Sequence, residues 1–245
     1  MQGQTPQGGP IFGPPGTGKT DILKAVLKIA KEREIKTIAI GVKDCFETGY
    51  VEFRIPESKI VRRISSILQF TSSDGFRISF DLLALAPCET IDCLIQYAEK
   101  EYREDIAKWI ISRLRLLKRF VYNDVVRIPL CLGEDDEGIR RLIVGILYVI
   151  RMYVPHLYIL DDALSYVINT VYLPAWIADT RPYMISLNYY AGDSREVLRF
   201  NPVIFSPGGH AGFFRLAHPS RYVIIFDSRR WEIDRKEIEK FVYSS

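Results

Sequence analysis

The sequence predicts an α/β fold with a mostly parallel sheet flanked by helices. Short apolar runs rich in Val, Ile and Tyr alternate with longer segments in which apolar residues recur every three or four positions. Residues 10–43 show this pattern, because the strand "PIF" is followed by the helix "TDILKAVLKIAKEREI" and the strand "KTIAIGV". A helix between two strands returns the chain to the start of the sheet, so the strands on either side run parallel.

Residues 44–130 break this alternation, and we interpret them as a largely helical insertion within a single domain of residues 1–245. The pattern predicts an irregular segment over "KDCFETGYVEFRIPESK", a helix over "SKIVRRISSILQF" and a short strand over "GFRISF". It then predicts one or two long helices over "CETIDCLIQYAEKEYREDIAKWIISRLRLLKRFVY". The insertion therefore lies between the second strand and the next strand of the sheet.

The alternation resumes after the acidic loop "GEDDEG". We expect a buried helix over "IRRLIVGILYVIRMY", then buried strands over "HLYIL" and "YMISLN" with a helical stretch between them. A short helix, "SREVLRF", leads to the strand "PVIF". The tail predicts strands over "GFFRLA" and "RYVIIF", and a terminal helix that starts at Asp234.

Composition and charge exclude some classes of protein. The longest apolar stretch, "LIVGILYVIRMYV", contains Arg151 and is too short to cross a membrane, so we expect no membrane insertion. A net charge of +3 over 245 residues does not by itself indicate a nucleic-acid-binding protein. Since no secretory signal is recognisable, we expect a cytoplasmic location, in the host cytoplasm if the protein is viral.

The cysteines and histidines do not indicate a metal site. Paired metal-ligand spacing is absent among His156, His210, His218 and the four cysteines, and we expect the cysteines to pack in the core: Cys45, Cys88, Cys93 and Cys131. Asn and Gln are scarce, whereas Ile, Val, Tyr, Arg and Glu are common. This bias resembles that of proteins from hot environments, where thermolabile amides are avoided.

The loop after the first strand carries the clearest chemistry. Residues 13–20, "GPPGTGKT", match the phosphate-binding pattern G-x-x-x-x-G-K-[ST] between a strand and a helix. Backbone N–H groups of such a loop converge on phosphate oxygens, and the helix N-terminus adds positive potential. Lys19 is placed to reach the β- and γ-phosphates, and Thr20 to offer its hydroxyl to Mg²⁺. We therefore expect ATP and Mg²⁺ as cofactors, bound by Gly13, Pro14, Pro15, Gly16, Thr17, Gly18, Lys19, Thr20 and Asp21.

Two adjacent acids follow the strand "HLYIL". A parallel strand would carry Asp161 and Asp162 to the carboxyl edge of the sheet, where the phosphate-binding loop also lies. Asp161 would then join Thr20 in binding Mg²⁺, and Asp162 would orient or deprotonate the attacking water. The alternative is that both acids cap the helical stretch that follows.

The segments "GPPGTGKT", "LYILDD" and "YMISLN", in this order, resemble the additional-strand, catalytic-acid division of the P-loop ATPases. The resemblance implies an extra strand between the P-loop strand and the acidic strand. It also implies that Asn188 is the polar residue that senses the γ-phosphate. The second acid of that division is usually Glu, and Asp162 is shorter by one methylene, which implies slow turnover or action through a second water.

Two branches of that division fit the sequence. The P-loop sequence "GPPGTGKT" and the segment "SLNYYAGDSREVLRFNPVIF" resemble those of AAA+ proteins. By this resemblance, Arg199 would reach the γ-phosphate of a neighbouring subunit. The strand-rich tail instead resembles the FtsK/HerA group, which includes viral genome-packaging ATPases. Terminal strands extend the sheet in that group, and an arginine precedes the sensor strand, as Arg181 does here. The group usually has Gln where this chain has Asn188.

The resemblance implies a Mg-ATP-dependent ATPase that acts on DNA as a ring, with six subunits expected. Its task would be translocation or packaging of DNA, for a virus or mobile element of a hot-environment archaeon. An AAA+ replication initiator or helicase loader remains an alternative, as does a nucleotide-gated adaptor with little hydrolysis. The basic clusters "KWIISRLRLLKRF", "VRRIS" and "DSRRW" could contact phosphates or form ordinary solvated faces.

Overall fold

The computed structural model describes residues 8–71, 77–133, 136–162, 182–187, 203–205, 221–226 and 229–244. The chain forms two compact units, which we call the sheet unit and the helical unit. The sheet unit comprises Met1–Thr48, Leu130–Glu134 and Pro155–Ser245, and the helical unit comprises Gly49–Pro129 and Asp135–Val154. The insertion proposed from the sequence covers most of the helical unit, which in addition takes the segment from Asp135 to Val154.

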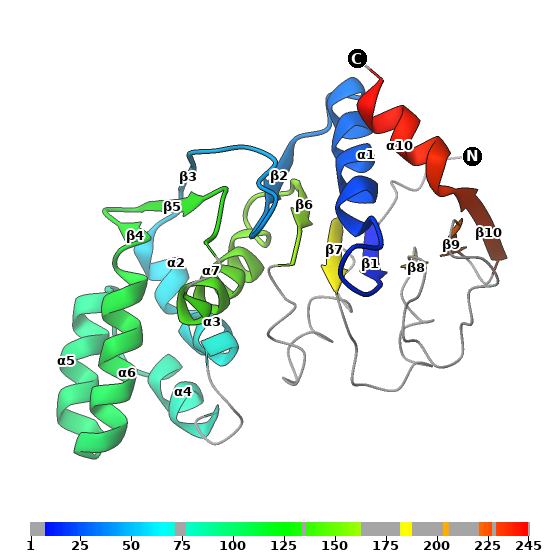
Figure 1. Ribbon diagram of the computed structural model, residues 1–245. Coiled ribbons are helices and arrows are strands. Elements are labelled where there is room, and N and C mark those ends of the chain that lie inside the picture. Colours follow the sequence, from blue (N-terminus) through cyan, green and yellow to red (C-terminus); the bar gives the residue numbers. More distant parts are fainter. Residues whose placement is uncertain are drawn as a thin grey trace. The chain divides into compact units, whose positions relative to one another are not determined.

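The sheet unit is built on a seven-stranded sheet of order β10-β9-β8-β1-β7-β6-β2 (Figure 1). Its parallel strands are β1 (Gly8–Phe12), β2 (Thr37–Ile40), β6 (Leu157–Leu160), β7 (Tyr183–Leu187) and β8 (Val203–Phe205). The antiparallel strands β9 (Arg221–Phe226) and β10 (Arg229–Asp234) extend the sheet beyond β8. The prediction of a mostly parallel sheet flanked by helices is confirmed.

Strand β7 lies between the P-loop strand β1 and the acidic strand β6. It pairs with both in parallel, with Phe12 opposite Leu187 and Leu160 opposite Ile185. This is the additional strand that the resemblance implied. Because the three strands run in the same direction, their carboxyl ends meet at one edge of the sheet.

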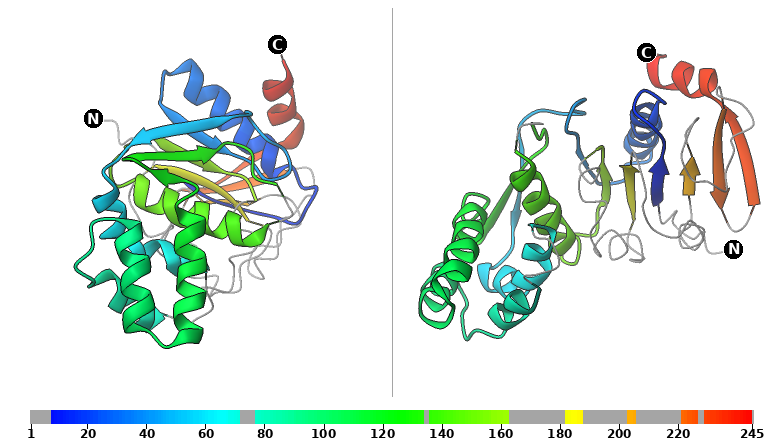
Figure 2. Two further views of the ribbon diagram at one scale, coloured as in Figure 1. Left: turned by 90° about the vertical axis from the view of Figure 1, so that its left-hand side faces the viewer. Right: turned by 60° about the horizontal axis from the view of Figure 1, so that its bottom comes forward.

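Helices α1 (Lys19–Glu32) and α10 (Arg235–Tyr243) pack side by side on the same side of the sheet (Figure 2, right). α1 buries an apolar stripe against the sheet, as its sequence period predicts. Lys28 Nζ donates to Phe241 O and Ser244 O, both at 2.8 Å, and so binds carbonyls at the end of α10. The core of the unit contains Ile11, Ile22, Leu23, Ala30, Ala39, Leu157, Ile159, Met184, Ile204 and Tyr222.

The helical unit contains six α-helices and a small sheet among its described residues. The helices are α2 (Glu57–Val61), α3 (Ile64–Leu68), α4 (Arg77–Ala84), α5 (Ile91–Glu101), α6 (Glu104–Leu117) and α7 (Glu137–Ile150), with the short 3₁₀ helix η1 (Gln69–Thr71) after α3. Helices α5 and α6 lie against each other (Figure 2, left). The antiparallel strands β3 (Tyr50–Arg54), β5 (Val125–Pro129) and β4 (Val121–Tyr122) form a sheet in that order. None of the helices in the described ranges is both long and apolar enough to cross a bilayer.

Helix α7 confirms the buried helix that the sequence predicts before the acidic strand. Its N-cap is Asp136, whose side chain accepts a hydrogen bond from Ile139 N at 2.9 Å. Gly145 lies where α7 meets α3, and a Cβ at this position would stand 2.5 Å from the carbonyl oxygen of Ile67. The two helices therefore approach closely because residue 145 has no side chain.

One predicted strand is wrong. The run "GFRISF" has a strand-like alternation, but residues 77–84 form helix α4. Phe80 and Leu83 are both fully buried and stand three positions apart, which places them on one helical face. A six-residue window was too short to distinguish the two periods, and the apolar residues that follow it continue the helix. Strands β3 and β5 were not predicted, since β3 lies in the segment interpreted as irregular.

Some predicted elements fall outside the described residues. These are the strand "GFFRLA", the helix "SREVLRF" and the helical stretch that follows Asp162.

The expectation that the four cysteines simply pack in the core is also wrong. All four form disulfides, Cys45–Cys131 in the sheet unit and Cys88–Cys93 in the helical unit. The first pair is 86 residues apart in sequence, so its partners could not be matched by spacing. An isolated parallel bridge between Gly41 and Cys131 brings the two segments together.

We predict that Gly145→Ala destabilises the protein by about 1–3 kcal/mol, because the added methyl group collides with the backbone of Ile67. The gain in helix propensity, about 1 kcal/mol, does not offset this cost. Thermal unfolding is the measurement, with Gly133→Ala as the control, since nothing lies within 4 Å of a Cβ there. An unchanged or raised melting temperature for Gly145→Ala would show that α3 and α7 do not pack at this distance.

Candidate functional site

The loop between β1 and α1 is held in a fixed shape at the carboxyl edge of the sheet. Gly13 N donates to Leu187 O at 3.1 Å, which ties the loop to β7. Thr17 Oγ1 donates to Pro14 O at 2.6 Å and closes the loop on itself. Gly18 has a φ of 82°, in the left-handed region that favours glycine, and its carbonyl accepts from Ile22 N.

Tyr222 on β9 supports the loop from the terminal part of the sheet. Its hydroxyl donates to Gly18 O at 3.3 Å, and its side chain is 1% exposed. Burial raises the pKa of Tyr222 to about 12. A Cβ on residue 18 would lie 2.2 Å from this hydroxyl, so Tyr222 can make this contact only because residue 18 is glycine. Sequence reasoning gave Tyr222 no role, and its one signal was a hydroxyl at the start of the apolar run "YVIIF".

Lys19 places its ammonium group inside the loop. Nζ donates to Gly13 O at 2.7 Å and to Pro14 O at 3.0 Å, and the residue is 5% exposed. Burial lowers the pKa of Lys19, while the carboxylates of Asp162 and Asp161 oppose this shift. A buried positive charge at a helix N-terminus creates a strong positive potential, which favours a polyanion.

Asp161 follows β6 directly and lies against the first turn of α1. Its Oδ2 accepts from Thr20 Oγ1 at 2.7 Å, and its Oδ1 accepts from Ser186 Oγ at 2.5 Å. The carboxyl group is only 4% exposed, and burial raises its pKa, although the hydrogen bonds from Ser186 and Thr20 counteract this. The hydroxyl of Thr20 and the carboxylate of Asp161 form a pair of hard oxygen ligands, as Mg²⁺ prefers.

Asp162 completes the acidic end of the site. It has a φ of 53°, which is uncommon for a residue with a side chain, so the chain turns sharply after Asp161. Asp162 N donates to Ser186 Oγ at 2.8 Å. Ser186, which is fully buried on β7, therefore contacts both acids. Sequence reasoning missed Ser186, although a hydroxyl within "YMISL" was a signal.

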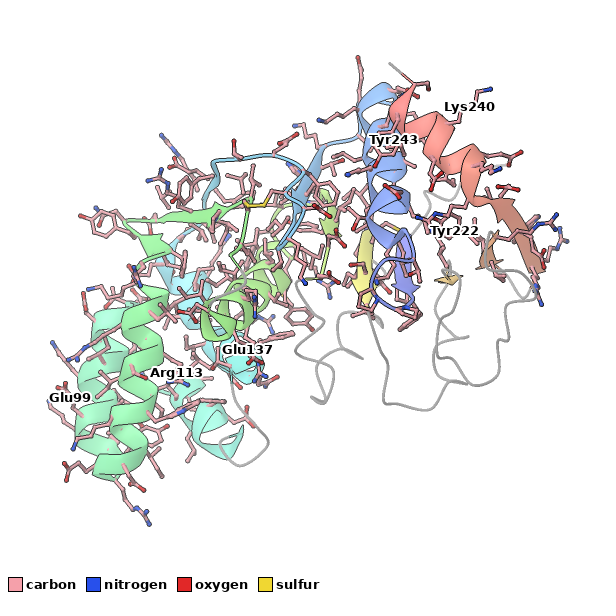
Figure 3. All side chains as sticks on the ribbon, viewed as in Figure 1. Glu99, Arg113, Glu137, Tyr222, Lys240 and Tyr243 are labelled. Carbon is pink, nitrogen blue, oxygen red and sulfur yellow. A yellow bond between two sulfur atoms is a disulfide. The ribbon has the colours of Figure 1, made fainter. Side chains whose placement is uncertain are left out.

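A cavity of about 350 Å³ brings these groups together. It is lined by Pro15, Gly16, Gly18, Lys19, Thr20, Asp21, Lys24, Lys43, Asp44, Asp161, Asp162, Arg235 and Tyr243. The structure thus joins the P-loop and the two acids that the sequence singled out. Arg235 and Tyr243 on α10 were not expected there. Figure 3 labels Tyr243 on this helix. Asn188, Arg181 and Arg199 lie outside the described residues.

Metal binding by protein groups alone is not favoured. In the ranges that the structure describes, no three side chains of His, Cys, Asp or Glu are grouped to hold a metal ion. Thr20 and Asp161 fit the alternative, in which Mg²⁺ takes few protein ligands and completes its shell with phosphate oxygens and water.

Comparison with known proteins gives the same fold. No family model and no curated protein matches the chain. VirB4 of Thermoanaerobacter pseudethanolicus matches with a TM-score of 0.54 and 10% identity, over 96% of this chain and 91% of that chain. The bacterial conjugative coupling protein TrwB, in an unbound form, matches with a TM-score of 0.53 and 12% identity, over 94% of this chain and 84% of that chain. The chain therefore shares the P-loop fold of these two structures.

The likeness concerns the fold alone, since identity is so low. The position of β7 and the terminal hairpin β9–β10 agree with the FtsK/HerA type of P-loop fold, in which terminal strands extend the sheet. The sequence left the AAA+ type as an alternative, and the extension of the sheet by β9 and β10 agrees with what the FtsK/HerA resemblance implied.

We predict that Asp161→Asn makes the metal-free protein more stable at pH 7.5, by about 0.5–2 kcal/mol. The folded-state pKa of Asp161 lies above its unfolded value, so the ionised carboxylate opposes folding at neutral pH. This cost disappears as the pH falls through the raised pKa, and the advantage of Asn should shrink with it. Thermal unfolding in EDTA at several pH values measures the difference. A less stable variant at pH 7.5 would show that the carboxylate is favoured for structural reasons.

Proposed function

We propose that this protein is a Mg²⁺-dependent ATPase. The observation that carries the proposal is the 2.7 Å hydrogen bond from Thr20 Oγ1 to Asp161 Oδ2. It joins the hydroxyl at the end of the P-loop to the first acid after β6, and a metal ion bound to a triphosphate needs both groups side by side. The P-loop fold supports the same conclusion.

The residues present fit both cofactors. Gly16 has no atom within 4 Å of the place where a Cβ would stand, so its backbone is open to a ligand. Backbone N–H groups of residues 13–20 and the N-terminus of α1 would bind the phosphates. Thr20 and Asp161 would hold Mg²⁺, which neutralises charge on the phosphate oxygens when it is bound.

The side chains around the phosphates then have separate tasks. The ammonium of Lys19, which now bonds to Gly13 O and Pro14 O, would turn to the β- and γ-phosphates. Asp162 would orient the attacking water and accept its proton. Ser186 would keep Asp161 and the backbone of Asp162 in position through its two hydrogen bonds. Asn188, by its place after β7, would contact the γ-phosphate.

We further propose that hydrolysis drives the movement of DNA through a ring of subunits, for translocation or packaging. The shared fold supports this, since TrwB is a conjugative coupling protein. Six subunits are the ring size we expect. An arginine from the neighbouring subunit would complete each site, and Arg181 is the candidate because it precedes β7, with Arg199 as the rival. A virus or mobile element of a hot-environment archaeon is the source that the composition favours.

The basic cluster of α6 gives little support for DNA contact. Lys108 pairs with Glu104 at 2.5 Å, and Lys118 pairs with Asp92 at 2.7 Å. The guanidinium of Arg113 lies 4.5 Å from the centre of the Trp109 ring. The charges of Lys108 and Lys118 are therefore compensated by carboxylates of the same unit.

We expect Lys19→Ala to weaken binding of Mg-ATP about 10- to 100-fold, the value of one or two charge-assisted hydrogen bonds. Asp162→Asn should retain nucleotide yet lose hydrolysis about 100-fold or more, as removal of a general base does. Binding is measured by calorimetry and hydrolysis by phosphate release. Glu99→Gln, an exposed carboxylate of the helical unit, is the matched control. Full hydrolysis by Asp162→Asn would show that Asp162 is not the general base, whereas a wild type that binds Mg-ATP and hydrolyses little of it would favour the nucleotide-gated adaptor.

We expect DNA to raise the rate of ATP hydrolysis several-fold, and Arg181→Ala to abolish turnover while ATP remains bound. Losing a trans arginine typically costs about 10³-fold or more. Arg199→Ala and Arg119→Ala are the comparisons, since each removes one positive charge elsewhere. If only Arg199→Ala loses activity, the arginine follows the AAA+ arrangement. A rate that DNA does not change would argue against translocation.

A further inference from the structure

A second hollow adjoins the P-loop cavity within the sheet unit. It has a volume of about 450 Å³ and lies between α1, the end of α10 and the loop after β2. Lys24 and Tyr243 line both hollows, so the two meet at these side chains. The other lining residues of the second hollow are Leu27, Lys28, Lys31, Glu32, Cys45, Phe46 and Val242.

The walls of the two hollows differ in chemistry. The P-loop cavity is lined by four cationic side chains and four carboxylates, which suits phosphates and a metal ion. The second hollow presents the apolar side chains of Leu27, Phe46 and Val242. Leu27 and Phe46 also pack against the core, and the disulfide from Cys45 to Cys131 ties the loop next to Phe46. This apolar wall is therefore fixed.

Lys28 and Lys31, two of the three lysines that line the second hollow, have partners in the protein. Lys28 Nζ donates to two carbonyls at the end of α10, and Lys31 Nζ pairs with Glu47 Oε1 at 2.9 Å. These contacts hold α10 and the loop after β2 in place. The apolar wall of Leu27, Phe46 and Val242 remains for a ligand, and such a wall suits a nucleobase better than a further phosphate.

Tyr243 stands at the junction with its ring exposed and its hydroxyl fixed. The residue is 63% exposed, yet its hydroxyl donates to Asp21 Oδ1 at 2.8 Å and Lys24 Nζ lies 5.7 Å from the ring centre. Figure 3 shows Tyr243 beside α1. An exposed aromatic ring that is held in one orientation can stack on a base at little cost in conformational entropy.

We propose that the nucleoside of the bound nucleotide occupies the second hollow, with its base packed against Tyr243 and the apolar wall of Leu27, Phe46 and Val242. The inference rests on the proposed function, because it takes the phosphates to lie in the P-loop cavity. It adds that α10 is part of the nucleotide site. It also makes the base, and not the triphosphate alone, a source of affinity.

The test compares a nucleotide with its phosphates alone. Calorimetry measures the binding of a non-hydrolysable ATP analogue and of inorganic tripolyphosphate, each with Mg²⁺. In the wild type the analogue should bind at least about 10-fold more tightly, the effect of stacking one base. Tyr243→Ala should weaken the analogue about 10-fold and leave tripolyphosphate unchanged, whereas Tyr243→Phe should keep most of the affinity because it keeps the ring.

Two further variants guard against a general loss of structure. Val242→Trp fills the hollow from a partly exposed position and should exclude the base without changing tripolyphosphate binding. Tyr122→Ala removes an equally exposed tyrosine, 65% accessible, from the helical unit and should change neither ligand.

The outcomes separate this inference from the proposed function. Equal affinity of the wild type for both ligands, or equal losses for both ligands in Tyr243→Ala, would overturn the nucleoside site while the P-loop proposal stands. A wild type that binds neither ligand would overturn both proposals. Selective loss of the analogue in Tyr243→Ala and Val242→Trp supports the site.

Discussion

The site depends on three parallel strands that end at one edge of the sheet. Because β1, β7 and β6 are neighbours in that order, Thr20 of the P-loop and Ser186 both come within hydrogen-bonding distance of Asp161. The contact between Thr20 and Asp161 spans 141 residues of sequence, and the register of the strands, not local chain geometry, creates it.

The site also holds charges that oppose folding. Lys19 and Asp161 are both nearly buried, and burial shifts the pKa of each toward its neutral form. The hydrogen bonds from Thr20 and Ser186 recover part of the cost for Asp161, and the two loop carbonyls do the same for Lys19. Binding sites commonly keep such groups, since a ligand of opposite charge stabilises them again.

The sequence predicted the site residues that belong to short, recognisable motifs. "GPPGTGKT" sits between a strand and a helix, and the pair Asp161 and Asp162 follows an apolar strand, so strand direction alone placed both at one edge. Ser186, Tyr222 and Tyr243 could not be predicted in this way, because their contacts depend on strand register and on how α10 packs against α1. The disulfide from Cys45 to Cys131 could not be predicted because its partners are far apart in sequence. Helix α4 was not predicted because the segment "GFRISF" is too short to distinguish a helix from a strand.

The hydroxyl of Tyr222 joins the terminal hairpin to the P-loop, although the two are separated by β8 in the sheet. A displacement of β9 by less than the 3.3 Å length of this hydrogen bond would change the position of Gly18 in the loop. A displacement of the loop would likewise change the position of Tyr222 in β9. Strand β10 pairs with β9 along its whole length and carries Trp231, opposite Ile224. Once the other two tryptophans, Trp109 and Trp176, are replaced by Phe, the intrinsic fluorescence of Trp231, which is 43% exposed, offers an optical readout of events at the loop without any added label.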